Sequence, residues 1–239
     1  MASPRKESRE ESCAESLGAG ERNSTARALR SQPPLRHPIL LLIDEGEETG
    51  LLGAQLFVDR DPAARDVRAV VNLDARGTEG PSLMFETGSA VDWSVSTLAG
   101  AARRPISNSL YYYIYQLLPN DTDFTVFKRA GLQGLNFAFV GGVQRYHTPL
   151  DRLSNLSPAT LQHQGENSLA AVRALASQAR LGDAPESRAV FLDLFGRTLL
   201  HWNASLALPF ALLLGALALA AGWVPLRRAG GGMASALRG

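Results

Sequence analysis

The chain has 239 residues, of which 45% are hydrophobic, and a formal net charge of +1 at pH 7. This length and hydrophobic content suffice for one packed domain of ordinary size with an appendage. A net charge so close to zero argues against a nucleic-acid partner bound through bulk electrostatics, and a single cysteine, Cys13, excludes an internal disulfide framework or a cysteine-rich metal site.

The first segment, residues 1–25, is charged and rich in Ser, Glu and Arg, with almost no large apolar side chain. Such a segment cannot bury enough surface to offset the entropy lost on ordering, so it is predicted to be disordered. It also lacks the apolar stretch of a signal peptide. We therefore expect the folded part of the chain to begin near residue 26.

Residues 26–180 alternate apolar runs of strand length with segments of helical periodicity. Strands are expected over residues 38–43, 67–73, 82–87 and 135–140. Helices are expected over residues 50–58, 91–102, 123–130 and 158 to about 180. This alternation predicts an α/β domain, a three-layer sandwich with a mostly parallel sheet.

Two of these helices have recognisable ends. Asp121 or Thr122 can cap the helix that starts at residue 123, and Gly131 follows it in the usual C-terminal glycine position. Ser157 precedes Pro158 at the start of the last helix, where proline is favoured at the first helical position.

The C-terminal part is predicted to cross a membrane. Residues 181–197 contain glycine and proline and read as a linker, and residues 198–226 form the predicted transmembrane segment. Its stretch 204–224 carries no charge and would be roughly 31 Å long as a helix, close to the thickness of a bilayer core. Trp202 and Trp223 stand at its ends, where interfacial aromatic residues are favoured. A buried helix of a soluble core is the alternative.

The short tail, residues 227–239, begins with Arg227 and Arg228. Positive charge next to a membrane span favours the cytoplasmic side. We therefore expect an integral membrane protein whose main domain lies on the non-cytoplasmic side, in a vacuolar or endomembrane lumen or a bacterial periplasm.

Acidic residues and a histidine follow separate predicted strands. Glu47 and Glu48 come after the first strand, Asp74 ends the second, and His147 lies in the loop after the fourth. Each has an ordinary explanation: a helix dipole for the glutamates, a turn for the aspartate, solvent exposure for the histidine. Because ligands bind at the carboxyl ends of strands, the set together predicts a zinc site.

Three motifs in order resemble a known family: Ile43–Gly53 (IDEGEETGLLG), Val71–Asp74 (VNLD) followed by Arg76 and Gly77, and Tyr146–Pro149 (YHTP) followed by Asp151. They are similar to motifs of the co-catalytic zinc aminopeptidases. The nearest branch is the membrane-bound one, with vacuolar membrane proteases and endoplasmic-reticulum metallopeptidases. Residues 118–124 (LPNDTDF) also fit that branch, and the resemblance covers about residues 26–176.

This resemblance implies a function for each residue of the set. Glu47 would be the general base, Glu48 a zinc ligand, Asp74 a ligand of a second zinc, and His147 a terminal ligand, while Tyr146 would hydrogen-bond the reaction intermediate. The implied substrates are peptides with a free N-terminus, hydrolysed by water that two Zn²⁺ ions activate. No organic cofactor is implied.

Two more carboxylates belong to the predicted neighbourhood. Asp151 would orient His147 through a hydrogen bond, and Asp123 would line the cleft. An ordinary turn explains Asp151 equally well, and helix capping explains Asp123 at least as well.

The sequence also departs from the family pattern. It contains neither the family's His-x-Asp motif nor the aspartate that bridges the two metal ions, and His37 stands on the wrong side of the first strand to replace them. We therefore interpret the chain as an N-terminally truncated member, whose sheet lacks its first strands. Zinc would be held weakly, because structural zinc sites are worth about 10–16 kcal/mol with all ligands present. Activity is expected to be impaired, and a non-enzymatic membrane scaffold or binding protein on the same fold is the alternative.

Overall fold

The computed structural model describes residue 28 and residues 35–236, in two compact units that divide between His201 and Trp202. The segment 1–25 lies outside the described residues. The elements of the first unit are, in chain order, α2 (Leu52–Arg60), η1 (Pro62–Asp66), β1 (Ala69–Ala75), β2 (Leu83–Thr87), α3 (Val91–Ala101), α4 (Ser109–Leu117), α5 (Asp123–Arg129), β3 (Gln133–Phe139), η2 (Val143–Arg145), η3 (Leu153–Asn155), α6 (Pro158–Ala176), β4 (Ala189–Leu194) and β5 (Thr198–Asn203), which runs across the division.

The main sheet has the strand order β1-β3-β2. Strand β3 pairs in parallel with β1 and antiparallel with β2, so the sheet is mixed and the prediction of a mostly parallel sheet is wrong. The reason is the short connection between β1 and β2, residues 76–82. Consecutive parallel strands need a crossover connection of a dozen or more residues. This loop is shorter, so β2 begins at the end of the sheet where β1 finishes and runs in the opposite direction.

The predicted strand at residues 38–43 is also wrong. This segment forms no strand, and most of its large apolar side chains are about half exposed, as at Leu40 (49%) and Ile43 (48%). An extended segment becomes a strand only when a neighbour pairs with its backbone. Within the described part of the chain, β1 is an edge of the sheet and does not pair with this segment.

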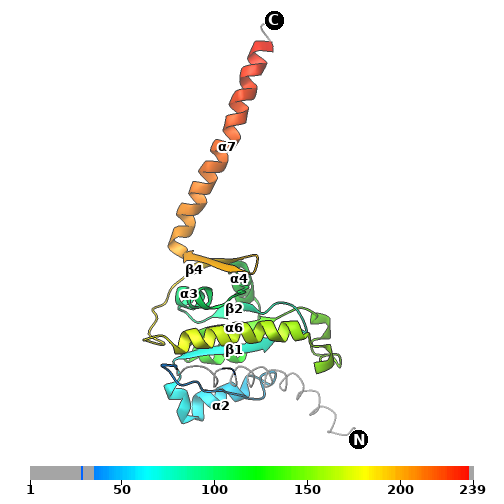
Figure 1. Ribbon diagram of the computed structural model, residues 1–239, viewed down its shortest axis with the longest axis vertical. Helices are drawn as coiled ribbons and strands as arrows, with labels where there is room; N and C mark the ends of the chain where they lie inside the picture. Colours follow the sequence, from blue (N-terminus) through cyan, green and yellow to red (C-terminus); the bar gives the residue numbers. More distant parts are fainter. Residues whose placement is uncertain (1–27, 29–34, 237–239) are drawn as a thin grey trace. The chain divides into compact units, whose positions relative to one another are not determined.

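Helices cover both faces of the sheet (Figure 1). Alternation along the strands sends Val71 and Leu73 of β1 into a core with α3 and α6, and Val70 into a second core with α2 and α5. Phe137 is fully buried in the larger core. The result is an α/β unit in which the carboxyl ends of β1 and β3 lie at one edge.

The helix ends agree with the sequence. Thr122 is the N-cap of α5, Gly131 follows it with a left-handed φ of 82°, and Ser157 caps α6 with its hydroxyl accepting from Thr160 N–H. Helix α6 ends at Ala176 rather than near Arg180. Local chemistry therefore fixes the helix ends more reliably than it fixes strand pairing.

Three elements of the fold were not expected. Helix α4 lies where no helix was predicted, and strands β4 and β5 form a two-stranded sheet inside the predicted linker and the start of the predicted membrane segment. The strands meet at a turn in which Arg197 N–H donates to Leu194 C=O at 3.1 Å. Both central residues, Phe195 (φ 54°) and Gly196 (φ 61°), are left-handed, as in the type I′ turn of hairpins.

The second unit contains η4 (Ala204–Leu206) and α7 (Ala207–Ala236). Residues 204–221 have a mean hydropathy of 2.2, and among the described helices only α7 is long and apolar enough to cross a bilayer. An apolar helix was predicted in this place. The side chains of Trp223, Arg227 and Arg228 lie outside the described residues.

Two glycines test the packing of these layers. A Cβ on Gly134 of β3 would lie 2.0 Å from Val70 C=O and 3.0 Å from the Phe124 ring, whereas a Cβ on Gly165 of α6 would meet nothing within 4 Å. We expect Gly134→Ala to lower the free energy of unfolding by about 1–3 kcal/mol through overpacking. Gly165→Ala should raise it by about 1 kcal/mol, since alanine favours the helix. Chemical denaturation of both variants measures this, and equal effects would contradict the packing described.

Candidate metal centre

Glu47 and Glu48 lie in a tight turn between residues 38–43 and α2. Gly46 has a left-handed φ of 80°, and the carbonyl of Glu47 accepts hydrogen bonds from Gly50 N–H (3.1 Å) and Leu51 N–H (2.9 Å). Helix α2 begins only at Leu52 and has no acidic residue in its first turn. An interaction with the helix dipole from within the first turn of α2 therefore does not account for the two glutamates.

Glu48 meets His147 across 99 positions of sequence. Its Oε1 lies 2.7 Å from His147 Nε2 and accepts a hydrogen bond of 3.3 Å from the Tyr146 hydroxyl. The Tyr146 and His147 rings are stacked, with centroids 3.8 Å apart. His147 adopts a left-handed φ of 55°, a conformation that is uncommon for residues other than glycine, although histidine adopts it more often than most, and that clusters at functional sites.

Arg76, the first residue after β1, lies with its guanidinium 5.6 Å from the centre of the Tyr146 ring. Burial, and then the negative charge of Glu48, raise the pKa of Tyr146 to about 12. Its hydroxyl therefore keeps its proton at neutral pH and acts as a hydrogen-bond donor.

Asp74 lies near the end of β1 and is partly buried. One carboxylate oxygen accepts from Ala75 N–H at 2.7 Å, and its carbonyl accepts from the buried side chain of Gln164 on α6 at 3.0 Å. Burial raises the pKa of Asp74 to about 6, and the charge of Glu48 adds to the rise, against the opposing effects of the Ala75 N–H and Arg76.

Glu47 is the most perturbed acid of the site. Burial, followed by the charges of Asp74, Glu48, Asp123 and Asp44, raises its pKa to about 8. Four other carboxylates therefore lie close enough to act on Glu47. A group with a pKa near neutrality can both accept and return a proton, which suits a general base.

The two additional predicted carboxylates also lie in this neighbourhood. The charge of Asp123, the first residue of α5, acts on Glu47. Burial raises the pKa of Asp151, while the nearby His147 opposes the rise. The backbone N–H of Asp151 donates to Thr148 C=O at 2.9 Å in a turn. The turn role of Asp151 is thus present, and a role in orienting His147 stays a prediction.

The donors suit zinc chemically, but they do not complete a zinc site. Carboxylates and imidazole bind Zn²⁺ at about 2.0–2.2 Å, normally four ligands at a time. Glu48 and His147 contact each other at hydrogen-bond distance, and within the described residues no three His, Cys, Asp or Glu side chains are placed to hold one metal ion. The structure thus brings two predicted ligands into contact and leaves Asp74 beside them.

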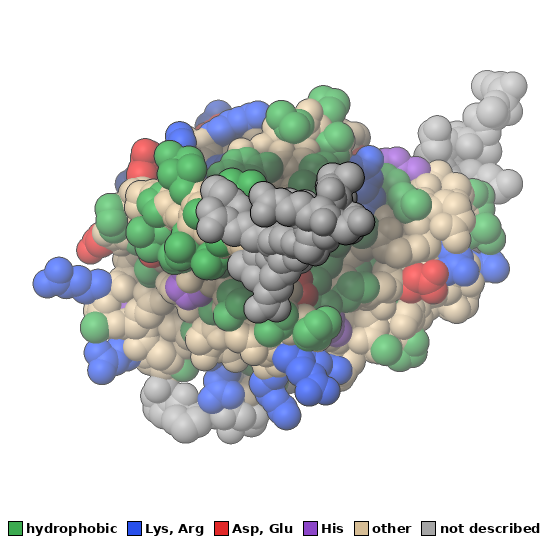
Figure 2. All heavy atoms as spheres, turned by 90° about the horizontal axis from the view of Figure 1, so that it is seen from above, with side chains coloured by type: hydrophobic (Ala, Val, Ile, Leu, Met, Phe, Trp, Pro, Cys, Tyr) green, Lys and Arg blue, Asp and Glu red, His purple; other side chains and the backbone are tan. Residues whose placement is uncertain are grey.

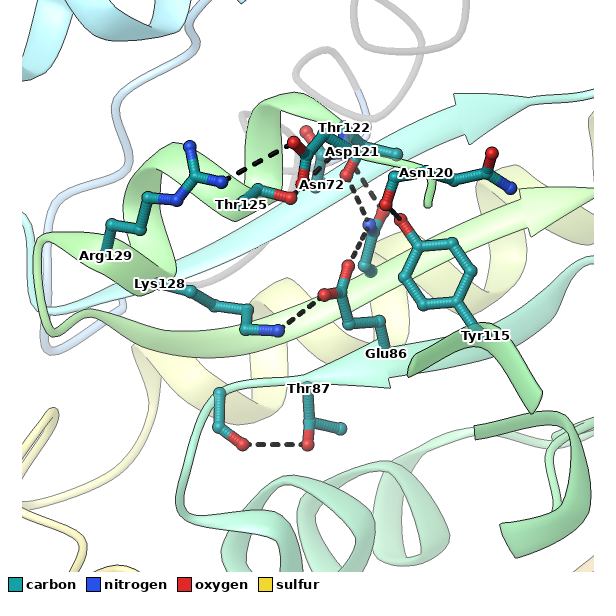
Figure 3. A network of polar contacts seen from close by, with 12 residues as sticks. Asn72, Glu86, Thr87, Tyr115, Asn120, Asp121, Thr122, Thr125, Lys128 and Arg129 are labelled. Carbon is teal, nitrogen blue, oxygen red and sulfur yellow. Dashed lines mark hydrogen bonds and ion pairs between the residues drawn. The ribbon is translucent and has the colours of Figure 1, made fainter. Parts of the chain in front are cut away.

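A row of polar contacts crosses the sheet from Asn72, which lies two residues before Asp74 on β1 (Figure 3). Asn72 of β1 donates to Asn136 of β3 at 2.9 Å, and Asn136 donates at 2.9 Å to both Glu86 of β2 and the Thr122 hydroxyl. Lys128 of α5 forms an ion pair of 2.6 Å with Glu86, whose side chain is almost completely buried. The row ties the start of α5, where Asp123 lies, to the strand that carries Asp74.

Sequence reasoning missed Gln164, which contacts the backbone carbonyl of Asp74, and the partners within the polar row. Gln164 sits on a helix 90 positions from Asp74, and Glu86 lies 50 positions from Asn136. Polar residues in apolar strands, such as Asn72 and Asn136, are the one signal that the sequence offers. Their partners follow only from the pairing of the strands.

Comparisons with known proteins identify a family for this chain. The model of Peptidase family M28 matches residues 18–172, well over half of the chain. Endoplasmic reticulum metallopeptidase 1 of Rattus norvegicus is 32% identical over 177 residues, covering 71% of this chain and 20% of the relative. Vacuolar membrane protease of Candida albicans (strain SC5314 / ATCC MYA-2876) is 31% identical over 163 residues, covering 67% and 18%.

Among solved structures, the chain is similar to BSAP, a zinc aminopeptidase from Bacillus subtilis, with a TM-score of 0.48 and 22% identity over 71% of this chain and 43% of that one. The chain spans about a fifth of the length of the curated relatives it matches. The extent of the family match nonetheless decides the classification: the chain belongs to peptidase family M28.

Proposed function

We propose that this chain is a membrane-anchored zinc metallopeptidase of the aminopeptidase type, acting on peptides with a free N-terminus. One observation carries the proposal: Glu48 and His147, 99 positions apart in sequence, meet at 2.7 Å at the edge of the sheet where Glu47 and Asp74 also lie. Membership of family M28 supports the same reaction class.

Glu47 would act as the general base of the reaction. Its raised pKa, about 8, favours accepting a proton from the attacking water and passing it to the leaving amine. The Tyr146 hydroxyl, which keeps its proton, would donate to the oxygen that gains negative charge. The excess of carboxylates over cations at this edge would favour a substrate that carries a positive N-terminal amine.

Impaired activity is the second part of the proposal. The chain supplies Glu48, Asp74 and His147 as metal ligands, and within the described residues these do not form a group of three around one point. Zinc, in the expected pair of ions or singly, would therefore bind more weakly than in a complete site. The same observation favours the alternative, a non-enzymatic membrane scaffold on this fold.

Helix α7 would anchor the chain in the bilayer, with the first unit on the non-cytoplasmic side. Its apolar stretch has the length and hydropathy of a span, and the named relatives are proteins of the endoplasmic reticulum and of the vacuolar membrane. Glycosylation-site mapping or protease protection in membranes tests the side on which the first unit lies.

Zinc affinity tests the site directly. We expect the full chain to bind zinc, and His147→Ala to weaken binding on the order of 100-fold, since one of four ligands carries about 3 kcal/mol of a site worth 10–16 kcal/mol. Calorimetric titration in detergent measures both. His37→Ala is the matched control, because His37 hydrogen-bonds Gln178 C=O at 2.9 Å, away from the site, and should bind zinc as the wild type does. Zinc-free wild-type protein, or equal loss in both variants, would contradict the assignment.

A further inference from the structure

The hairpin β4–β5 has two apolar faces, and the described residues of the first unit cover one of them. Its inner face packs into the main core through Phe191, and the backbone N–H groups of Phe191 and Asp193 donate at 2.9 Å to Ser109 Oγ and Ser107 C=O. Alternate residues point the other way. The outer residues Leu192, Leu194 and Leu200 are 38–44% exposed.

The tip of this hairpin carries an aromatic residue where local chemistry disfavours one. Phe195 occupies the first central position of the turn with a φ of 54°, a position at which Asn, Asp and Gly are strongly preferred. Its side chain is 90% exposed, so it gains almost no burial within the described residues. A bulky residue that is both strained and exposed indicates that a surface outside the first unit covers Phe195.

A second apolar surface begins beside the hairpin. Helix α4 starts where Asn108 bridges Leu192, and it exposes a stripe at helical spacing. The stripe consists of Leu110, Tyr113, Ile114 and Leu117. Figure 2 shows the molecule from above, with hydrophobic side chains over much of the view and lysine and arginine side chains toward its rim.

Chain connectivity indicates what covers these residues. Strand β5 ends at Asn203, and the apolar stretch of the membrane span begins at the next residue, Ala204. Six residues of strand extend roughly 20 Å at most, so the whole hairpin stays within that distance of the bilayer surface. Exposed Arg188 directly precedes the hairpin and exposed Arg197 lies in its turn, and arginine beside aromatic and aliphatic residues suits the headgroup region.

We propose that the hairpin β4–β5 is a membrane-interface element: Phe195 and the outer leucines insert among the lipid headgroups and seat the peptidase unit on the bilayer. This inference rests on the proposed membrane anchoring. It adds a second contact, made by the folded unit itself, which limits how the site can face the membrane.

Fluorescent probes at two single cysteines test the contact. In the full chain with Cys13→Ser, one protein carries a probe at Thr198→Cys, on the outer face of β5, and another at Leu56→Cys, an exposed residue of α2. Both are reconstituted in vesicles of phosphatidylcholine and phosphatidylserine. Lipid-borne nitroxide should quench the probe at 198 about threefold more strongly than the probe at 56, since interface elements lie about 5–10 Å into the headgroup boundary.

Phe195→Asn separates docking from folding. Asparagine tolerates the left-handed turn, so the melting temperature in detergent should stay equal or rise, while quenching of the probe at 198 falls to the level of the probe at 56. Unchanged quenching in this variant would overturn the docking of the hairpin. So would water-exposed probes in a chain that resists alkaline extraction, and in that case the anchoring of the chain by α7 would still stand. Full extraction by alkali would overturn anchor and docking together. Probe self-quenching that rises with protein density would assign the hairpin to a second copy instead.

Discussion

Glu47→Gln should lower the rate of peptide hydrolysis about 10²- to 10⁴-fold, the usual contribution of a positioned general base. An amide cannot take the proton of the attacking water or return it to the leaving amine, although glutamine has the same shape as glutamate. Release of fluorophore from aminoacyl substrates by the full chain in zinc-supplemented buffer measures the change. Zinc affinity should be nearly unchanged, because Glu48 and His147, the pair in contact, are intact.

Glu45→Gln is the matched control for this experiment. Glu45 lies in the same acidic segment, and its backbone carbonyl accepts from Gly53 N–H at 3.0 Å, a contact that the substitution leaves in place. Its hydrolysis rate should equal that of the wild type. Equal losses of hydrolysis rate in both variants would indicate a general effect of negative charge. A zinc-loaded wild type that releases no amino acid would contradict the peptidase function and favour the scaffold function.

Lys128→Met should lower the free energy of unfolding by about 3 kcal/mol, because it leaves the buried carboxylate of Glu86 without its counter-charge. The value stands at the low end of the range for broken buried pairs, since the lysine side chain is one-third exposed. Methionine keeps the apolar stem of lysine, so the change reports on charge more than on packing. Chemical denaturation in detergent measures the loss.

Two variants check that burial is the cause. Arg129→Met removes the neighbouring ion pair to Asp121, which is longer (3.5 Å) and exposed on both sides, and should cost less than about 1 kcal/mol. Lys128→Met combined with Glu86→Gln should recover about half or more of the loss, because no charge is left buried. Equal losses of unfolding free energy in the Lys128 and Arg129 variants would show that the buried ion pair with Glu86 stabilises the fold no more than the exposed pair does.

Local features of the sequence predicted much of this unit. The caps at Thr122 and Ser157 and the glycine at residue 131 are found where the sequence places them, because side chains within a few residues decide a helix end. The acids after residues 38–43 and after β1 and the histidine after β3 also lie near one another, since the parallel pairing of β1 with β3 brings their carboxyl ends together. The chemical roles of Glu47, Glu48 and Asp74 stay predictions.

Pairing between distant segments could not be read in the same way. Residues 38–43 have the composition of a buried strand, but a strand also needs a neighbour with free backbone groups. The direction of β2 depends on the length of one loop. The hairpin β4–β5 was missed because β4 lies in a stretch that reads as a linker and β5 runs directly into the apolar helix that follows. In each case the deciding factor lies in another part of the chain.

The polar row through Asn72 and Asn136 restricts how β1 and β3 can pair. Asn72 and Asn136 face each other in the alignment of β1 with β3, and both are satisfied only in that alignment. Sliding either strand by one residue would turn its asparagine toward the aromatic and aliphatic core, where the amide would lose its partners. The row thus selects one register among several that apolar side chains alone would tolerate. The same register fixes the position along the strand of the Asp74 carboxylate, two residues after Asn72.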